Sequence, residues 1–132
     1  MTHTTREQDW LRDMQAAAEQ TLQFTAGMDK AAFLADAVKQ RAVFFNIIVL
    51  GEVSTRLMDA SPALVARHPE IAWRAIRNMR NQVAHGYATI DLGVVWRTVT
   101  EVLPDLLAKL PTVYAAAAQP PAADTSPPTA AS

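Results

Sequence analysis

The chain has 132 residues, of which half are apolar, no cysteine, and a formal net charge of −1. This length is typical of a single domain, and the lack of cysteine excludes disulfides, thiolate nucleophiles and cysteine-based zinc sites. A charge so close to zero argues against a broad basic surface for nucleic acid, but it is compatible with a small local cluster of arginines. No apolar run reaches the roughly 18 residues of a membrane span and no secretory signal is visible, so we expect a soluble, cytoplasmic protein.

Apolar residues recur at three- and four-residue steps, which predicts helices rather than strands. The first helix is expected to follow a capping box at Thr4-x-x-Glu7 and to end near Gly27. A longer second helix is expected from residue 29 or 30 to 58, and its almost wholly apolar middle is typical of a helix buried in a bundle. Ser61 followed by proline predicts the start of a short third helix.

The fourth helix is expected over about 70–85, with Gly86 as its stop. A fifth helix should begin near Asp91, which is a good N-cap, and Pro104 should kink or restart it. The second half of the chain therefore continues the helical pattern of the first.

From about residue 115 the chain consists almost entirely of Ala, Pro, Ser and Thr. Such a segment lacks the large apolar side chains that a core needs, so we predict a disordered tail over 115–132. The rest, residues 1–114, is predicted to form one all-α domain, a bundle of four or five helices.

The fourth helix is expected to have two distinct faces, because successive residues lie about 100° apart. Its apolar stripe consists of Ala72, Ile76, Met79 and Val83, and its polar stripe of Arg74, Asn78, Asn81 and His85, with Arg77 at the edge. Arg80 lies at the border of the apolar face. A face needed only for solubility would more often carry Glu and Lys, since Asn is a poor helix former. His85 precedes the expected helix end, where the helix dipole favours a protonated imidazole, and that role alone explains it equally well.

The segment RNQVAHGY at 80–87 resembles the R-x4-H-x-Y signature of the HEPN superfamily, specifically its HepT-like toxin branch. The resemblance covers most of residues 8–110 and also rests on GE at 51–52, PEIAWRAIRNMRNQVAHGY at 69–87, IDLGVVW at 90–96 and VLPDL at 102–106. It implies a HEPN-type helical bundle that forms a homodimer and cleaves RNA without a metal or other cofactor.

Transferred to this chain, the resemblance implies that Arg80 and His85 of two protomers line a shared catalytic cleft, supported by Asn81 and Tyr87. It also implies a partner, an MNT-type nucleotidyltransferase antitoxin of a type II toxin–antitoxin system. That antitoxin would neutralise the toxin by transferring AMP to Tyr87. A tyrosine that packs over a helix end with its hydroxyl in water is the alternative reading of Tyr87.

The chemistry of RNA cleavage agrees with these residue types, because the 2′-OH of RNA can itself attack the adjacent phosphate. His85 would act as general acid or base, Arg80 would hold the phosphate oxygens, and Asn81 would orient the imidazole or donate to a phosphate oxygen. Arg74 and Arg77 are further candidates for RNA contacts. Residues five apart lie about 140° apart on a helix, so two copies meeting at a two-fold axis would assemble the site better than one chain.

Two other functions fit the same stripe. One is a non-catalytic helical subunit that binds nucleotides or presents a substrate to a nucleotidyltransferase, and the other is a dimerisation module that binds a partner protein. Neither needs Arg80, Asn81, His85 and Tyr87 together, so the ribonuclease is favoured. The three histidines show no metal-ligand spacing, so no metal is expected. Glu52 is interpreted either as an internal partner for an arginine or as part of the site.

Overall fold

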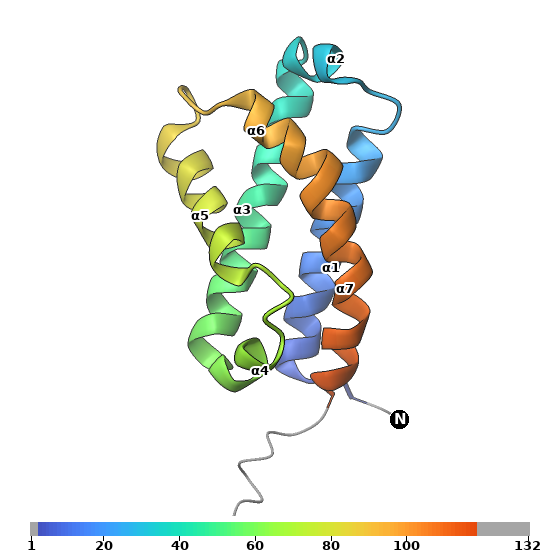
Figure 1. Ribbon diagram of the computed structural model, residues 1–132, viewed down its shortest axis with the longest axis vertical. Coiled ribbons are helices and arrows are strands. Elements are labelled where there is room, and N and C mark those ends of the chain that lie inside the picture. The colour runs from blue at the N-terminus through green and yellow to red at the C-terminus, as the bar shows by residue number, and fades with distance from the viewer. Residues whose placement is uncertain (1–2, 119–132) are drawn as a thin grey trace, which may run out of the picture.

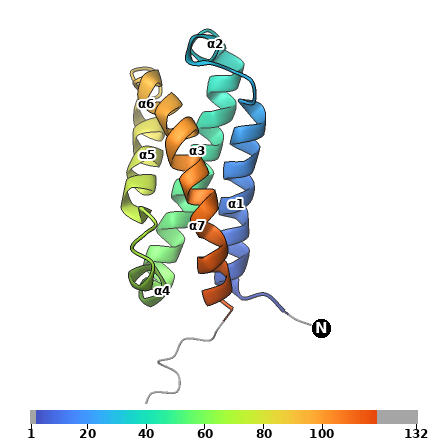
Figure 2. The ribbon, with the colours of Figure 1, turned by 45° about the vertical axis from the view of Figure 1, so that its right-hand side comes forward.

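The computed structural model describes residues 3–118, and among them it contains helices and no strands. The elements are α1 (Arg6–Phe24), α2 (Lys30–Leu34), α3 (Ala37–Ala60), α4 (Pro62–Arg67), α5 (Trp73–Gly86), α6 (Leu92–Arg97), the π-helical segment η1 (Thr98–Val102) and α7 (Leu103–Ala116). Helices α1, α3 and α7 run side by side, α5 packs on α3, and α2 and α4 lie at opposite ends (Figures 1 and 2). The predicted all-α bundle is confirmed. No helix in the described part is long and apolar enough to cross a membrane.

The capping box of α1 lies one residue later than the predicted Thr4-x-x-Glu7. The Thr5 hydroxyl accepts a hydrogen bond of 3.0 Å from the backbone N–H of Gln8, and the Gln8 side chain accepts one of 3.1 Å from the backbone N–H of Thr5. Gln8 suits this position because it is buried and also donates to the carbonyl of Tyr114 at 3.2 Å. The box therefore fixes the start of α1 against the end of α7.

The prediction of one long second helix is wrong, because the structure divides this segment into two helices, α2 and α3. The Asp36 carboxylate caps α3 by accepting a hydrogen bond of 3.0 Å from the backbone N–H of Lys39. The Gln40 amide donates to the carbonyls of Phe33 and Leu34 at 2.9 and 3.1 Å, and so satisfies the end of α2. Two polar side chains thus provide the partners that a helix break requires.

Helix α5 starts at Trp73, later than predicted, because the preceding link is held in a non-helical form. The indole N–H of Trp73 donates to the carbonyl of His68 at 3.0 Å. Ala72 therefore lies outside the helix and is exposed, whereas Ile76 and Val83 of the predicted apolar stripe are buried and Met79 is half-buried. The apolar face of α5 is thus confirmed except for its first member.

The predicted end of this helix at Gly86 is confirmed, but Gly86 is its last helical residue and not a left-handed cap. Gly27 is the one glycine of the described part with a positive φ, 77°. The next residue, Tyr87, keeps a helical backbone with φ −56° and ψ −29°. The site residues at the end of α5 are consequently presented from a regular helical turn.

Pro104 is accommodated by a π-helical turn that directly precedes α7. The backbone N–H of Leu103 bonds to the carbonyl of Thr98, five residues earlier, and Pro104 follows as the second residue of α7. The wider turn makes room for a proline ring, which lacks an N–H and would crowd a regular turn. The chain therefore remains helical through Pro104, with one widened turn in place of the predicted kink or restart of the helix.

The end of α7 changes the predicted domain boundary. The helix runs to Ala116, and Ala117 is buried and accepts a hydrogen bond of 2.9 Å from the Thr5 hydroxyl through its carbonyl. Residues 115–118 of the predicted tail therefore belong to the fold, and the rest of that prediction, 119–132, lies outside the described residues.

Two groups of buried apolar side chains fill the bundle. The larger joins α1, α3 and α7 with the start of α5. The smaller holds the end of α5 between α2, α3 and α6, and consists of Phe33, Val43, Phe44, Ile47, Val83, Val95 and Val99. Burial of these side chains fixes the turn of α5 that carries the R-x4-H-x-Y motif.

Glu7 links the start of α1 to the α3–α4 junction, because its carboxylate accepts a hydrogen bond of 2.5 Å from the Ser61 hydroxyl. That bond is the main cause of the lowered pKa of Glu7, and hydrogen bonding to Arg6 adds to it. A lowered pKa means that the ionised carboxylate stabilises the fold. This stabilisation is complete above the ordinary pKa of 4.5 and is lost as the pH falls through the lowered value.

We therefore expect Ser61→Ala to reduce the free energy of unfolding by about 1 kcal/mol at neutral pH. The reduction should become smaller at acidic pH, as the pH falls through the lowered pKa and the Glu7 carboxylate of the wild-type protein protonates. Urea denaturation of both proteins across this range measures the difference. A reduction that stays constant with pH would contradict the assigned role of Glu7.

Candidate active site

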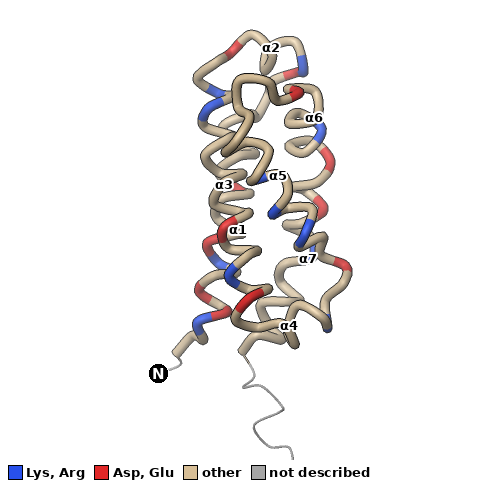
Figure 3. Tube along the Cα trace, turned by 90° about the vertical axis from the view of Figure 1, so that its left-hand side faces the viewer, with Lys and Arg blue, Asp and Glu red and all other residues tan. Residues whose placement is uncertain are grey.

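Helix α5 is locally basic in a protein of net charge −1. It carries Arg74, Arg77 and Arg80 and contains neither Asp nor Glu. Figure 3 shows these basic positions on α5 with no acidic position among them, whereas α1 carries both signs. Arg74 is exposed, Arg77 is half-buried, and the side chain of Arg80 is 20% exposed. The exposed and half-buried arginines of this helix are accordingly suited to an anionic ligand.

The Arg80 guanidinium is held from two sides. Its Nε–H donates to Oδ1 of Asn81 at 2.9 Å, and its Nη1 donates to Oε1 of Glu52 on α3 at 2.5 Å. The interpretation of Glu52 as an internal partner for an arginine is thus confirmed, and that arginine is Arg80. The Glu52 side chain is 48% exposed, so the ion pair lies at the surface rather than in the core.

Gly51 allows the close approach of α3 and α5 beneath this ion pair. A Cβ atom at position 51 would lie 2.1 Å from Cβ of Arg80 and 2.7 Å from its Cγ. No side chain other than hydrogen fits there without moving α5. The adjacent pair Gly51-Glu52 therefore has two roles, since the glycine admits the stem of Arg80 and the glutamate binds its head.

His85 and Tyr87 are both accessible at the end of α5. His85 is exposed and, within the described residues, its ring makes no hydrogen bond. Tyr87 is 61% exposed, so its ring is not packed tightly over the helix end. Asn81 lies one turn before His85 and is engaged by Arg80 through its Oδ1. These side chains are available to an external partner, while Arg80 is already fixed from within the chain.

The structure does not bring Arg80 and His85 together within one chain. Arg80 faces α3, where Glu52 meets it, whereas His85 lines a cavity of about 510 Å³ between α5 and the start of α6. Gln82, Thr89 and Asp91 share the lining of that cavity with His85. Gln82 lies one turn before His85 on the same helix, whereas sequence reasoning missed Thr89 and Asp91, because helical periodicity gives no contacts across the turn that follows α5.

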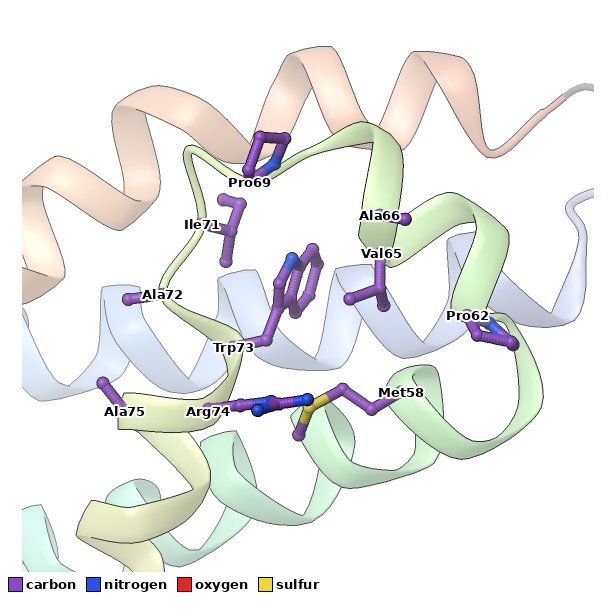
Figure 4. Close-up of a pocket in the computed structure, with 10 residues that line it drawn as sticks. All are labelled: Met58, Pro62, Val65, Ala66, Pro69, Ile71, Ala72, Trp73, Arg74 and Ala75. Carbon is purple, nitrogen blue, oxygen red and sulfur yellow. The ribbon is translucent and has the colours of Figure 1, made fainter.

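Another cavity, of about 530 Å³, lies between α4 and the start of α5 (Figure 4). Figure 4 shows the indole of Trp73 between Val65 and Ile71, and Met58 and Arg74 also line the cavity. Its lining has no carboxylate, imidazole or hydroxyl, so it offers no group for proton transfer. Of the predicted RNA contacts, Arg74 thus borders an apolar hollow at the far end of α5 from His85.

Helix α3 presents an apolar surface that leads to the Arg80–Glu52 pair. Val38 is 78% exposed and Phe45 is 66% exposed, although both are large apolar side chains. Together with Glu52 they are spaced seven residues apart, which places all three on the same side of the helix. We call Val38, Phe45 and Glu52 the α3 face. Exposed apolar side chains in such a row are typical of a surface that another protein covers.

No group of three or more His, Asp and Glu side chains that could hold a metal ion occurs within residues 3–118. The functional groups on α5 are instead guanidinium, imidazole, amide and phenol. Such a set can bind a phosphate, transfer protons and accept a modification.

Comparisons with known proteins agree on one family. Residues 14–113 match the family described as "Ribonuclease HepT-like". The "Probable ribonuclease HepT" of Thermococcus cleftensis is 36% identical over 101 residues, which cover 76% of this chain and 89% of that protein. The "Putative RNase MJ0127" of Methanocaldococcus jannaschii is 25% identical over 96 residues, or 73% and 77% of the two chains. No solved structure matches the chain.

Proposed function

Because the chain belongs to the family of HepT-like ribonucleases, we propose that it is a metal-independent endoribonuclease and the toxin of a type II toxin–antitoxin system. The observation that carries this proposal is the arrangement on α5. Arg80 is fixed by Glu52 and Asn81, and the exposed imidazole of His85 lies one helical turn beyond Asn81. The absence of acidic residues from α5 favours a polyanion as its ligand.

In the proposed reaction, the 2′-oxygen of a ribose attacks the adjacent phosphorus and the bond to the 5′-oxygen of the next nucleotide breaks. His85 accepts the proton of the 2′-OH as general base or supplies a proton to the leaving 5′-oxygen as general acid. Arg80 donates hydrogen bonds to the phosphate oxygens, on which negative charge accumulates. The products are a 2′,3′-cyclic phosphate and a 5′-hydroxyl.

The test is incubation of the purified protein with single-stranded RNA in excess EDTA, followed by analysis of the product ends. Cleavage with 2′,3′-cyclic phosphate and 5′-hydroxyl ends is expected. Cleavage that requires added metal would contradict the mechanism, and intact RNA would contradict the activity. Intact RNA together with tight binding of nucleotides would instead favour the non-catalytic nucleotide-binding subunit.

We also propose that the active protein is a homodimer in which the α3 faces and the ends of α5 of two copies meet. Two observations support this arrangement. Arg80 and His85 are directed to different sides of one α5, and the exposed apolar residues of the α3 face lead directly to Glu52 beside Arg80. A two-fold axis repeats one patch on both chains, so it can place Arg80 of one copy beside His85 of the other.

Phe45→Asp is expected to convert the dimer into a monomer and to abolish RNA cleavage, because a charge would replace an apolar contact at the centre of the α3 face. Size-exclusion chromatography with light scattering measures the mass. Ala63→Asp, an exposed position in α4, is the matched control and should keep the mass and activity of the wild type. A dimeric Phe45→Asp protein would contradict this interface.

The partner in this proposal is an MNT-type nucleotidyltransferase antitoxin that transfers AMP to Tyr87. The phenol oxygen would attack the α-phosphate of ATP, and pyrophosphate would leave. The 61% exposure of Tyr87 at the end of α5 supports its role as acceptor. AMP at this position would add negative charge beside the site and so compete with RNA.

Co-expression with the cognate nucleotidyltransferase is expected to raise the intact mass of this protein by one or more AMP units. The increase should disappear in Tyr87→Phe. It should remain in Tyr114→Phe, since the half-buried Tyr114 is the second of the two tyrosines and its hydroxyl accepts a hydrogen bond of 2.7 Å from Arg12. Modification that persists in Tyr87→Phe would assign the acceptor elsewhere.

A further inference from the structure

The contacts of Arg80 divide its guanidinium into an occupied and a free part. Of its five N–H groups, Nε–H is engaged by Asn81 and one N–H of Nη1 by Glu52. Within the described residues, Nη2 makes no hydrogen bond. The two occupied groups hold the plane of the guanidinium from α5 and from α3, so the free edge has a defined direction.

We propose that Glu52 is a positioning residue for RNA cleavage, one that aims the free Nη2 edge of Arg80 at the phosphate whose bond breaks. This inference rests on the proposed ribonuclease function. Glu52 touches no substrate atom in this scheme and acts through Arg80. It lies on α3, outside the R-x4-H-x-Y motif, and so extends the site to a second helix.

The physical basis is that an unrestrained arginine samples many rotamers, which must be restricted before its hydrogen bonds can form in the transition state. Glu52 and Asn81 restrict them in advance. Gly51 contributes by letting the stem of Arg80 lie against α3, where a Cβ would overlap it. A preorganised donor needs no reorganisation when charge develops on the phosphate, which is the condition for a large catalytic effect.

The negative charge of Glu52 should weaken substrate binding, although the same carboxylate positions Arg80 for catalysis. A carboxylate beside Arg80 repels the phosphate and reduces the positive potential of the site. A positioning role of Glu52 therefore predicts different effects on kcat and on KM. Removing the charge should lower kcat, since Arg80 is released, while KM stays the same or falls. A residue needed only for RNA affinity would raise KM and leave kcat unchanged.

A purely structural salt bridge does not explain the pair. Glu52 is 48% exposed, and ion pairs at such positions contribute little to stability. The melting temperature of Glu52 variants should consequently stay close to that of the wild type, and light scattering should show that they remain dimers, since Glu52 belongs to the α3 face. The exposed pair of Arg97 and Glu101, at 3.3 Å, should likewise contribute little to stability, and Glu101→Gln is therefore a matched control that removes a carboxylate paired with a different arginine.

The kinetic experiment compares the full-length wild type with Glu52→Ala, Glu52→Gln and Glu101→Gln on an RNA oligonucleotide. Glu52→Ala should lower kcat by about 10- to 100-fold without raising KM. Glu52→Gln should recover part of the loss, because its amide oxygen still accepts a hydrogen bond from Arg80. Glu101→Gln should match the wild type. Unchanged kcat in Glu52→Ala, or an effect confined to KM, would overturn the proposal.

A second measurement does not depend on activity. In a ¹⁵N NMR spectrum, the Nη1–H signal of Arg80, assigned by its loss in Arg80→Lys, should be sharp and protected from solvent exchange in the wild type, because Glu52 accepts its hydrogen bond. It should broaden or vanish in Glu52→Ala and persist in Glu101→Gln. If the wild type fails to cleave RNA, the proposed function fails while this spectrum still reports on Arg80. A signal unaffected by Glu52→Ala would overturn the positioning role.

Discussion

Replacing His85 with alanine is expected to slow RNA cleavage by about 10²–10⁴-fold, the usual contribution of a general acid or base. The fold should be unaffected, because His85 is exposed and its ring makes no hydrogen bond within the described residues. Single-turnover rates on an RNA oligonucleotide measure the effect. His3→Ala, an exposed histidine before α1, is the control and should cleave like the wild type. Full activity of His85→Ala would exclude the assigned role.

Arg80→Ala should have an effect of about 10²–10³-fold, because the phosphate loses a fixed donor of positive charge. Arg80→Lys should remain impaired, since an ammonium cannot replace a planar fork that is held by Glu52 and Asn81 on two sides. Mixing the two inactive proteins then tests whether the site is shared. If Arg80 of one chain works with His85 of the other, a mixed dimer of Arg80→Ala and His85→Ala chains contains one intact site.

Random exchange of subunits should therefore restore about one quarter of the wild-type rate, because half of the dimers are mixed and each has one of two sites intact. Sites built within a single chain would stay inactive in every combination. The result separates a shared cleft from a site built within one chain, and it requires no knowledge of the natural RNA. An inactive mixture of demonstrably exchanged dimers would contradict the proposed assembly.

The sequence predicted the helical class and the faces of α5 because both depend on apolar periodicity, which a helix in a bundle must display. Its errors occur where polar side chains end helices. The break between α2 and α3 depends on Asp36 and Gln40, and the apolar pattern continues across it. The end of α7 extends beyond the predicted boundary for a related reason, since Ala117 packs in the larger apolar core and its carbonyl accepts a hydrogen bond from the Thr5 hydroxyl at the other end of the chain.

The candidate site, too, was predicted only where its residues lie on a single helix. Helical spacing placed Arg80 at the border of the apolar face of α5, and the structure shows it there, partly buried against α3. Spacing within one helix does not identify the residue on the neighbouring helix, so the sequence predicts Glu52 either as a partner for an unspecified arginine or as part of the site. The cavity beside His85 was not predicted, because Thr89 and Asp91 reach it from beyond the end of α5.

Gly51→Ala is expected to destabilise the protein by about 1–3 kcal/mol, because the added Cβ overlaps atoms that cannot move independently. It would lie 2.1 Å from Cβ of Arg80 and 3.3 Å from the carbonyl oxygen of Ile76, so α5 must shift away from α3. In a helix the same change normally stabilises by up to about 1 kcal/mol. A loss of stability in Gly51→Ala would therefore demonstrate the close contact between α3 and α5. Chemical denaturation measures this loss.

For Gly86→Ala, which is the same chemical change, we expect no loss of stability. Its Cβ would lie no closer than 3.4 Å to the Thr89 hydroxyl, so the helix should be unchanged or more stable by about 0.5–1 kcal/mol. A Gly51→Ala protein as stable as the wild type would show that α3 and α5 do not approach this closely. At temperatures where Gly51→Ala remains folded, its cleavage rate should still be reduced, since a displaced α5 carries Arg80 away from Glu52 and removes the restraint on its guanidinium.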